Sequence, residues 1–140
     1  MKPFPWFAWC LPGLLVTGAA RAASPAEGAA EPFTSELKRT WSILREQPES
    51  WRTRDGVLEV RVLPGNMWGG ANDAKNTFVR KVPNPADGPV EVSVQVENRP
   101  TEQFEQVDLC WYYADSHQVK IGQELVDGKL SIVMGREEND

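Results

Sequence analysis

Apolar and polar side chains alternate along most of the chain after residue 51. Between residues 57 and 62, Leu58, Val60 and Val62 fall on one side while Glu59 and Arg61 fall on the other. Alternation with a period of two indicates a β-strand that buries one face. The same alternation predicts four more strands, within residues 90–97, 107–113, 119–124 and 130–134.

Turn motifs separate these segments: Asp55-Gly56, Pro64-Gly65, Asp87-Gly88-Pro89, Asp115-Ser116 and Asp127-Gly128. Glycine in such motifs accepts a positive φ, and aspartate hydrogen-bonds to its own backbone. The last motif has the composition of a two-residue hairpin turn. Strands spaced about 8 to 12 residues apart with such turns predict an all-β, antiparallel sandwich or barrel.

Two segments depart from the alternation. In residues 35–46, Ser35, Leu37, Trp41 and Leu44 approach helical spacing, so a helix competes with a strand, and we favour strand or irregular structure. Residues 64–75 are rich in glycine and asparagine, which predicts a loop without regular structure.

The first 22 residues have the order of an export signal. A basic start at Lys2 is followed by an apolar stretch and by small residues that end at Ala22, where we expect cleavage. A membrane-spanning helix is less favoured, because Pro12 and Gly13 interrupt a run shorter than the roughly 20 residues that a bilayer requires. Cys10 lacks the preceding residues of a lipoprotein signal.

Composition then indicates the domain organisation, the location and the charge of the mature protein. We predict a signal peptide at 1–22, a flexible leader at 23–32 that has no large apolar side chain, and one folded domain at 33–140. The expected location is secreted or periplasmic. The formal charge of −5 becomes −7 on cleavage, because residues 1–22 hold Lys2 and Arg21 and no acidic residue. An acidic surface argues against nucleic acid and against membrane binding after processing.

Three stretches carry a resemblance to a known family: WSILREQPESWRTRDGVLEVRV at 41–62, NTFVRKVP at 76–83, and EQVDLCWYYADSHQVKIGQELVDGKLSIVMGRE at 105–137. They resemble the concanavalin-A-like β-sandwich (jelly-roll) domains of uncharacterised function that are related to the C-terminal domain of β-xylosidases. The family's pattern matches here at Trp41, Glu46, Gly56, Asn76, Phe78, Arg80, Glu105, Gln106, Leu109, Tyr112, Tyr113, Lys120, Glu124, Asp127 and Gly128.

The resemblance covers nearly all of residues 33–137 and implies a secreted sandwich domain. Members of that family continue for several strands beyond the position of Asp140, so we expect either a sandwich that lacks its C-terminal strands or a shortened sequence. An incomplete sheet leaves an exposed edge that pairs readily with other strands. A dimer or a strand-completing protein partner would cover such an edge.

Catalytic chemistry has weak support in the sequence. Retaining glucanases need two carboxylates about 5.5 Å apart, and no E-x-D-x-E run is present. Glu105, Asp108 and Glu124 could converge across strands, but we favour ion pairs with Lys120 or Arg80. We therefore assign no catalytic residue and rank a glycoside hydrolase last.

Metal and thiol chemistry have equally weak support, and we predict no cofactor. His117 is the only histidine, so a multi-histidine metal site is excluded. The oxygen-rich loop with Asn66, Asn72, Asp73 and Asn76 is better interpreted as a turn than as a Ca²⁺ site. Cys110 is better interpreted as a buried hydrophobic residue than as a reactive thiol, and as the single cysteine left after cleavage it has no intrachain disulfide partner.

Sugar binding requires an aromatic face for the ring and planar polar groups for the hydroxyls. The chain supplies these types at Trp68, Arg80, Asp108, Tyr112, Lys120 and Glu124, which we predict to bind a ligand. Trp68 and Tyr112 serve equally well as packing residues. The sequence, together with the resemblance, therefore predicts a secreted, non-catalytic domain that binds a polysaccharide or oligosaccharide, with a structural or protein-interaction module as the alternative.

Overall fold

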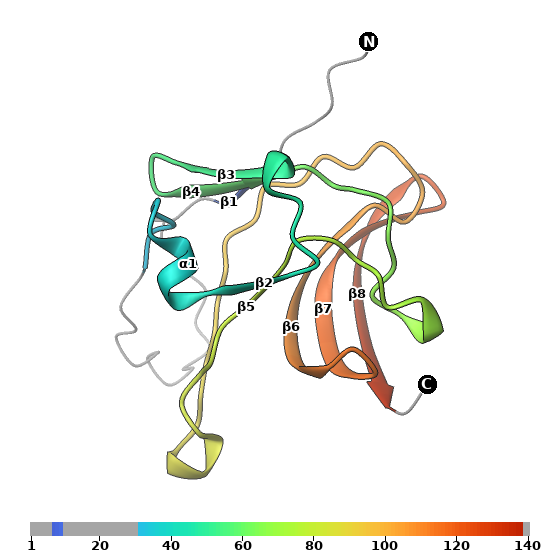
Figure 1. Cartoon of the computed structure of the whole chain (residues 1–140). Helices are drawn as coiled ribbons and strands as arrows, with labels where there is room; N and C mark the ends of the chain where they lie inside the picture. Colours follow the sequence, from blue (N-terminus) through green and yellow to red (C-terminus); the bar gives the residue numbers. More distant parts are fainter. Residues whose placement is uncertain (1–6, 10–30, 139–140) are drawn as a thin grey trace, which may run out of the picture.

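The computed structural model of the chain describes residues 7–9 and 31–138, which fold into three small antiparallel sheets (Figure 1). The first sheet has the order β1 (Phe7–Trp9), β4 (Val57–Val60) and β3 (Trp51–Arg54). The second pairs β2 (Ser42–Leu44) with β5 (Thr77–Val79). The third has the order β6 (Gln106–Ala114), β7 (His117–Val126) and β8 (Lys129–Glu138). The prediction of an all-β, antiparallel protein is therefore confirmed.

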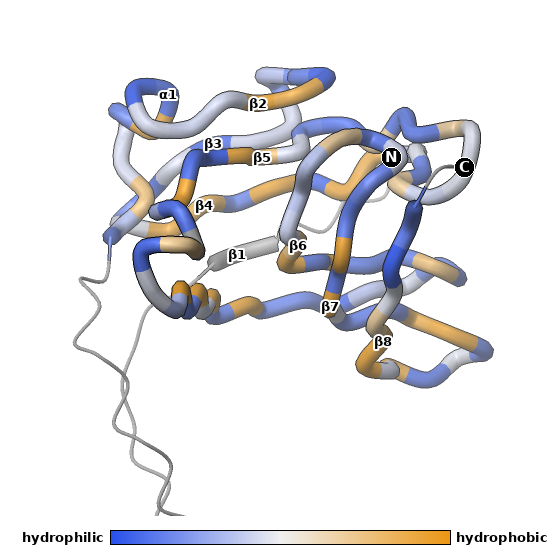
Figure 2. The backbone as a smooth tube through the Cα atoms, turned by 90° about the horizontal axis from the view of Figure 1, so that it is seen from below, coloured by the Kyte–Doolittle hydropathy of each residue, from blue (hydrophilic) through white to orange (hydrophobic). Residues whose placement is uncertain are grey.

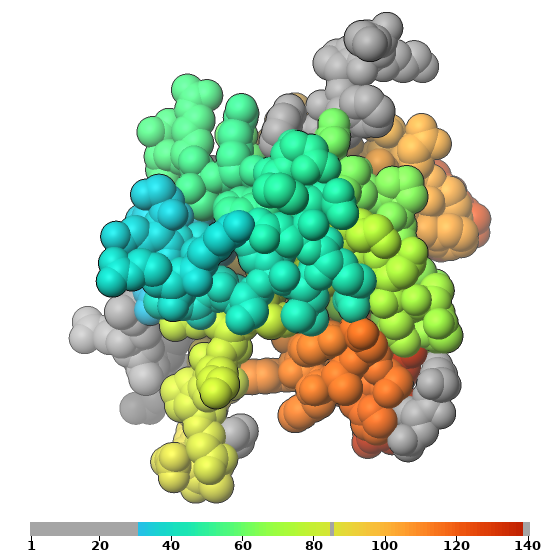
Figure 3. Space-filling model, viewed as in Figure 1, coloured from blue at the N-terminus to red at the C-terminus, as the bar shows by residue number. Residues whose placement is uncertain are grey.

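Within residues 7–9 and 31–138, helical structure is confined to single turns. They are α1 (Leu37–Thr40) and the 3-10 turns η1 (Pro48–Ser50), η2 (Gly69–Ala71) and η3 (Pro85–Asp87). The predicted loop at 64–75 is irregular except for η2. Figure 3 shows the third sheet, in orange, beside the cyan and green first part of the described chain, while the segment around η3, in yellow, projects away.

The third sheet is a meander built by the predicted turns. Asp127 and Gly128 have φ of 49° and 72°, so both central residues of the β7–β8 turn are left-handed, as the type I′ hairpin requires. Asp115 and Ser116 form the β6–β7 turn. The three strands predicted at 107–113, 119–124 and 130–134 are confirmed, and each extends further than the alternation indicated.

The strand predicted at residues 90–97 is absent. These residues form an extended connection with no ladder, apart from an isolated bridge at Glu97 (Figure 1, yellow to orange). The alternation nevertheless holds in part, because Val90, Val94 and Val96 are half-buried while the residues between them are exposed. Val92 is 43% exposed. Period-two alternation thus identified most of the inward side chains, but a strand also needs a neighbour to pair with.

Residues 35–46 combine both competing interpretations. Leu37, 4% exposed, anchors the single turn of α1, and Trp41 then adopts extended dihedrals (φ −118°, ψ 141°) that end the helix. The chain continues directly into β2. The favoured interpretation as strand or irregular structure is right for β2, and the helical alternative is right for one turn only.

An aromatic core joins the first two sheets. The rings of Trp51 and Phe78 meet edge to face with centroids 5.5 Å apart, and those of Phe33 and Trp41 lie 6.0 Å apart. Leu58 on β4 is 2% exposed. Such aromatic pairs contribute about 1 kcal/mol each beyond the area they bury.

The N-terminal predictions fall largely outside the described residues. Strand β1 lies within the predicted signal peptide and pairs with β4, Ala8 standing opposite Glu59. The rest of residues 1–22, and 23–30 of the predicted leader, are not described. Near the predicted start of the domain, the Phe33 N–H donates to the Gly56 carbonyl at 3.0 Å. In the described part of the chain, no helix is long and apolar enough to cross a membrane.

Candidate functional site

The third sheet presents two chemically different faces. Residues that stand opposite one another in neighbouring strands share a face, so Cys110, Lys120 and Gly135 lie on one side. We call this side the polar face: Gln106, Asp108, Cys110, Tyr112, Gln118, Lys120, Gly122, Glu124, Ser131, Val133, Gly135 and Glu137. The opposite side is the apolar face: Val107, Leu109, Trp111, Tyr113, His117, Val119, Ile121, Gln123, Leu125, Leu130, Ile132, Met134, Arg136 and Glu138. In Figure 2 the hydrophilic and hydrophobic colours alternate along these strands.

The loop 64–75 is fastened to the polar face by two buried side chains. Gln118 and Glu137 are each 2% exposed, and Gln118 Nε2 donates to Glu137 Oε2 at 2.9 Å. Glu137 Oε1 accepts from the Gly69 N–H at 2.8 Å, and Gln118 Nε2 also donates to the Met67 carbonyl. The polar face is therefore an interior surface, and its polar groups hold the loop in place.

The polar residues of this loop hold its own shape. Asp73 Oδ1 accepts from the Asn66 N–H at 2.8 Å, and Asn66 Oδ1 accepts from the Trp68 N–H at 2.9 Å. The bond from Asn66 is the main cause of the lowered pKa of Asp73. Asn72 has φ of 37°, a left-handed value that asparagine tolerates well. Across the described residues, no group of three or more His, Cys, Asp or Glu side chains could hold a metal ion. These contacts match the interpretation of the loop as a turn.

Trp68 lies on the sheet at the centre of this loop, half-buried. A Cβ built at Gly135 would come within 2.8 Å of Trp68 Cη2, so the indole rests directly on the glycine backbone. The Lys120 ammonium lies 5.4 Å from the Trp68 ring centroid, within the range of a cation–π contact. Trp68 is thus held against β8 and beside Lys120 of β7, and the residue as a whole is half-buried.

Lys120 links this aromatic ring to buried polar groups. Its ammonium donates to Gln106 Oε1 and lies 3.4 Å from Asp108 Oδ2, and the side chains of Lys120 and Asp108 are 11% and 3% exposed. Burial raises the pKa of Asp108, Lys120 lowers it, and Glu124 on the same face raises it again. The prediction that Lys120 pairs with a carboxylate is confirmed for Asp108.

Cys110 lies on the same face and stands opposite Lys120 in the register of β6 and β7. Burial, and secondarily the charge of Asp108, raise the pKa of the thiol to about 12. A thiol with that pKa is protonated at neutral pH and is a poor nucleophile. Cys110 is half-buried, and its interpretation as a packing residue rather than a reactive thiol stays a prediction.

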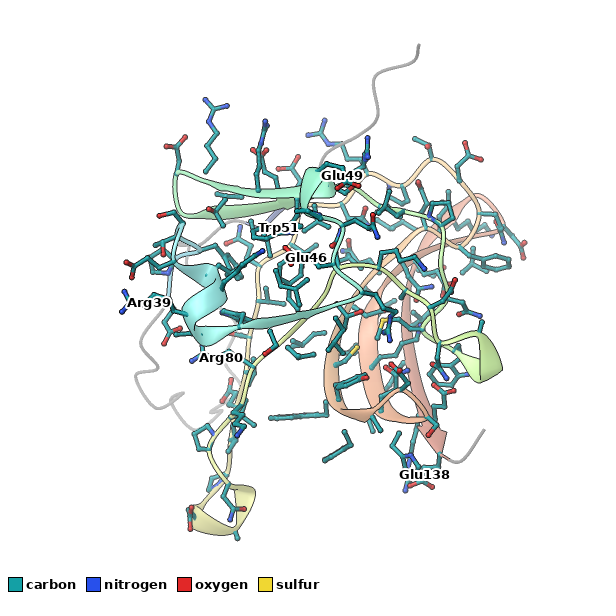
Figure 4. All side chains as sticks on the ribbon, viewed as in Figure 1. Arg39, Glu46, Glu49, Trp51, Arg80 and Glu138 are labelled. Carbon is teal, nitrogen blue, oxygen red and sulfur yellow. The ribbon has the colours of Figure 1, made fainter. Side chains whose placement is uncertain are left out.

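Two of the predicted ligand-binding residues lie outside this cluster. Tyr112 shares the polar face, but its hydroxyl donates to Asp115 Oδ1 at 2.7 Å, and Arg45 also binds that carboxylate. Arg80 follows β5, stacks on Trp41 at 5.4 Å and pairs with Glu31. Figure 4 places Arg80 beside α1, on the other side of the molecule from Glu138 at the end of β8. Of the six predicted ligand-binding residues, the structure therefore brings four together at the polar face: Trp68, Asp108, Lys120 and Glu124.

Sequence reasoning missed the residues that hold this cluster: Gln106, Gln118, Gly135 and Glu137. One signal was present, because a glycine inside a strand often marks the close approach of another group, and Gly135 stands in the alternating segment of β8. Gln118 and Glu137 gave no such signal, because each looks like an ordinary exposed strand residue until the loop is placed over it.

The three carboxylates considered for hydrolysis do not form a catalytic group. Glu105 Oε2 accepts from the backbone N–H groups of Thr101 and Glu102, which closes the turn before β6. Asp108 and Glu124 share the polar face on neighbouring strands, but Asp108 is buried against Lys120. The carboxylate of Glu105 therefore has a structural role in the turn before β6.

A second aromatic cluster lies near α1. Trp51 Nε1 donates to Glu46 Oε1 at 3.2 Å, and the two residues are labelled in Figure 4. The Lys38 ammonium lies 2.6 Å from the same oxygen and 5.5 Å from the Trp51 ring centroid. Phe78 covers another edge of Trp51. Trp51 and Trp68 are both half-buried, and Trp51 contacts Glu46, Lys38 and Phe78 between the first two sheets, away from the third sheet.

We expect Gly135→Ala to displace Trp68 and loosen the loop. A contact of 2.8 Å is far inside van der Waals distance, and overpacking of this kind costs about 1 to 3 kcal/mol. Because the loop can yield, we expect the lower end of that range, with faster amide hydrogen exchange at Gly69 and an altered near-UV circular dichroism spectrum. Gly70→Ala is the control, since no atom lies within 4 Å of its added Cβ. Equal exchange rates in both variants would contradict the assigned position of Trp68.

No model of a protein family, no curated protein and no solved structure matches the chain.

Proposed function

We propose that the chain is a secreted, non-catalytic carbohydrate-binding domain whose ligand contacts Trp68 and the polar groups around it. The observation that carries this proposal is the position of Trp68: a half-buried indole held on a rigid sheet, with the Lys120 ammonium beside the ring. A sugar needs an aromatic surface for its C–H groups and nearby donors and acceptors for its hydroxyls.

The neighbours of Trp68 supply both kinds of polar group. Lys120 donates, while Gln106 and Glu124 are half-buried and carry amide and carboxylate oxygens. Because Gly135, Gln118 and Glu137 fix the loop in advance, little conformational entropy would be lost on binding. Arg80 is not part of this proposed site, and Tyr112 would lie at its edge.

The proposed architecture is a concanavalin-A-like sandwich. The most specific part of the resemblance, residues 105–137, forms the β6–β8 meander, and its Asp127-Gly128 motif makes the left-handed turn between β7 and β8. The proposed location, secreted or periplasmic, rests on the basic, apolar and small-residue order of residues 1–22.

The same geometry favours binding over hydrolysis. A general acid must reach the substrate within hydrogen-bonding distance, and Asp108 is 3% exposed with its Oδ2 facing Lys120. A carboxylate that is buried in this way can orient Lys120, but it is not exposed enough to contact a ligand.

Intrinsic fluorescence of the purified chain, titrated with xylan, arabinan, β-glucan and mannan oligosaccharides, tests the proposal. We expect a saturable shift with at least one glycan, and a loss of affinity of about fivefold to a hundredfold in Trp68→Ala, because stacking contacts of this size contribute about 1 to 3 kcal/mol. Trp111→Ala is the matched control, since Trp111 lies on the apolar face of the same sheet.

Either of two results would overturn it. The unmodified chain could give no signal with any glycan by fluorescence and by calorimetry. Alternatively, Trp111→Ala could reduce binding as much as Trp68→Ala, which would move the site away from the polar face.

A protein-interaction module is the second candidate function, and one observation favours it. Six large apolar side chains of the third sheet are exposed together on the apolar face. That surface is separate from the Trp68 site and is treated next.

A further inference from the structure

The apolar face of the third sheet is exposed across all three strands. Its exposed side chains and their exposed fractions are Trp111 38%, Tyr113 77%, Ile121 50%, Leu130 53%, Ile132 68% and Met134 77%. Strand register makes them neighbours: Ile121 stands opposite both Leu109 and Met134, and Ile132 stands opposite Gln123. They therefore form one continuous patch.

The area of this patch is too large for an ordinary free surface. With residue areas of about 150 to 250 Å², the six exposed fractions amount to roughly 700 Å². Monomeric proteins rarely expose a contiguous apolar patch above about 300 to 600 Å². A standard protein–protein interface buries about 800 Å² on each partner, so this one face would supply nearly all of what a stable complex requires.

The shape of the patch also suits another sheet. Val94 and Val96 belong to the extended connection that runs beside the strands, and they line one side of an apolar groove of about 290 Å³. Its floor is made by Val107, Leu109, Ile121 and Ile132. Side chains of an opposing sheet could enter this groove, as the inner faces of two sheets interdigitate when they pack about 10 Å apart.

Charge on the face favours a second copy of the chain over a charged ligand. The ionisable side chains among the paired residues of this face are His117, Arg136 and Glu138, all at the same end of the face, and Arg136 pairs with Glu138. Gln123 is a further polar residue of the face. Two copies can therefore stack without burying an unpaired charge, which is the main cost that would prevent such an interface. A two-fold axis through the patch makes it self-complementary, because each partner contributes the same residues.

We propose that the apolar face of β6–β8 is the interface through which two copies of the chain stack sheet against sheet. This contact differs from pairing along an exposed strand edge, because it uses side chains and leaves the β8 backbone free. It is also independent of glycan binding, since the Trp68 site lies on the opposite face.

Sedimentation velocity of the full chain, over a range of protein concentrations, tests this interface. We expect a reversible dimer, and we expect the double variant Ile132→Lys/Met134→Lys to raise its dissociation constant at least a hundredfold, because two charges would enter the buried centre. Both side chains are already more than two-thirds exposed, so the fold should remain intact by circular dichroism.

Val82→Lys is the matched control, because Val82 is an exposed apolar residue outside the third sheet, 38% exposed after β5. It should dimerise like the unmodified chain. A chain that stays monomeric at every concentration would overturn the proposal, as would a dimer that the double variant leaves unchanged. A dimer that is broken by Ser131→Pro but not by the double variant would show edge pairing of β8 and would also overturn it.

Discussion

Replacing Gly122 with alanine should destabilise the chain by about 3 kcal/mol or prevent it from folding, which is the upper range for overpacking in a protein interior. An added Cβ would lie 2.2 Å from Asp108 Oδ1, 2.2 Å from the Val107 carbonyl oxygen and 2.9 Å from Asp108 Cα. Two of these atoms belong to the backbone of β6, which cannot move without breaking its ladder with β7. Urea unfolding, followed by far-UV circular dichroism, measures the loss.

Alanine substitutions at two other glycines provide comparisons for this prediction. Gly70→Ala adds a methyl group to open space and should change the free energy of unfolding by less than about 0.5 kcal/mol. Gly135→Ala meets a tryptophan side chain that can move, so its effect should be intermediate. If Gly122→Ala unfolds at the same urea concentration as Gly70→Ala, that result would contradict the close approach of β6 to Gly122 of β7.

The β6–β8 meander could be predicted because its signals are local. Alternation located the strands, and Asp127-Gly128 supplied the two left-handed positions that a tight hairpin needs. The strand predicted at 90–97 shows the limit of that reasoning. Its side chains largely alternate in burial as expected, yet pairing depends on a neighbouring strand, and composition within the segment does not encode where that neighbour lies.

Only part of the candidate site was predicted, because here too the sequence does not encode which strands become neighbours. Trp68, Lys120 and Asp108 were chosen by residue type, and the structure brings them together because Lys120 and Asp108 lie on adjacent strands of one face. Arg80 was chosen by residue type too, but its strand belongs to the second sheet and its guanidinium stacks on Trp41. Residue type alone does not say which sheet a strand joins.

The burial of the two faces of the third sheet is the reverse of what is usual for a sheet with one polar and one apolar side. The side that carries Asp108, Gln118 and Glu137 is covered, whereas the side that carries Ile132 and Met134 is exposed. From alternation alone, the apolar side would be placed in the core. The covered polar side is stable because the loop 64–75 satisfies several of its hydrogen bonds, and the exposed apolar side is what leads us to propose a second copy.

Buried charge on the polar face gives the second large expected effect. In Lys120→Met, Asp108 would keep its buried position but lose the ammonium that pairs with it. Removing one member of a buried ion pair typically costs about 3 to 5 kcal/mol, because the remaining charge is uncompensated. We expect a loss of that size at pH 7, measured by urea unfolding.

The loss should shrink as the pH falls, and the sign follows from the pKa of Asp108. Burial raises this pKa in the folded state above its unfolded value of 3.8, so the folded state binds the proton more tightly. The contribution of Asp108 to stability is therefore greatest below the unfolded pKa and declines as the pH rises through the folded pKa. Because Lys120 lowers the pKa of Asp108, its removal should extend this decline to higher pH.

The double variant Asp108→Asn/Lys120→Met is the control for this mechanism. It has no charge left to bury at either position, so it should be more stable than Lys120→Met at pH 7 and should lack the decline that Asp108 causes. At pH 4 the two variants should differ less than at pH 7, because a larger fraction of Asp108 is then protonated in the folded state of Lys120→Met. A loss in Lys120→Met that is the same at pH 4 and pH 7 would mean that Lys120 stabilises the sheet through its packing against Trp68 rather than through its charge.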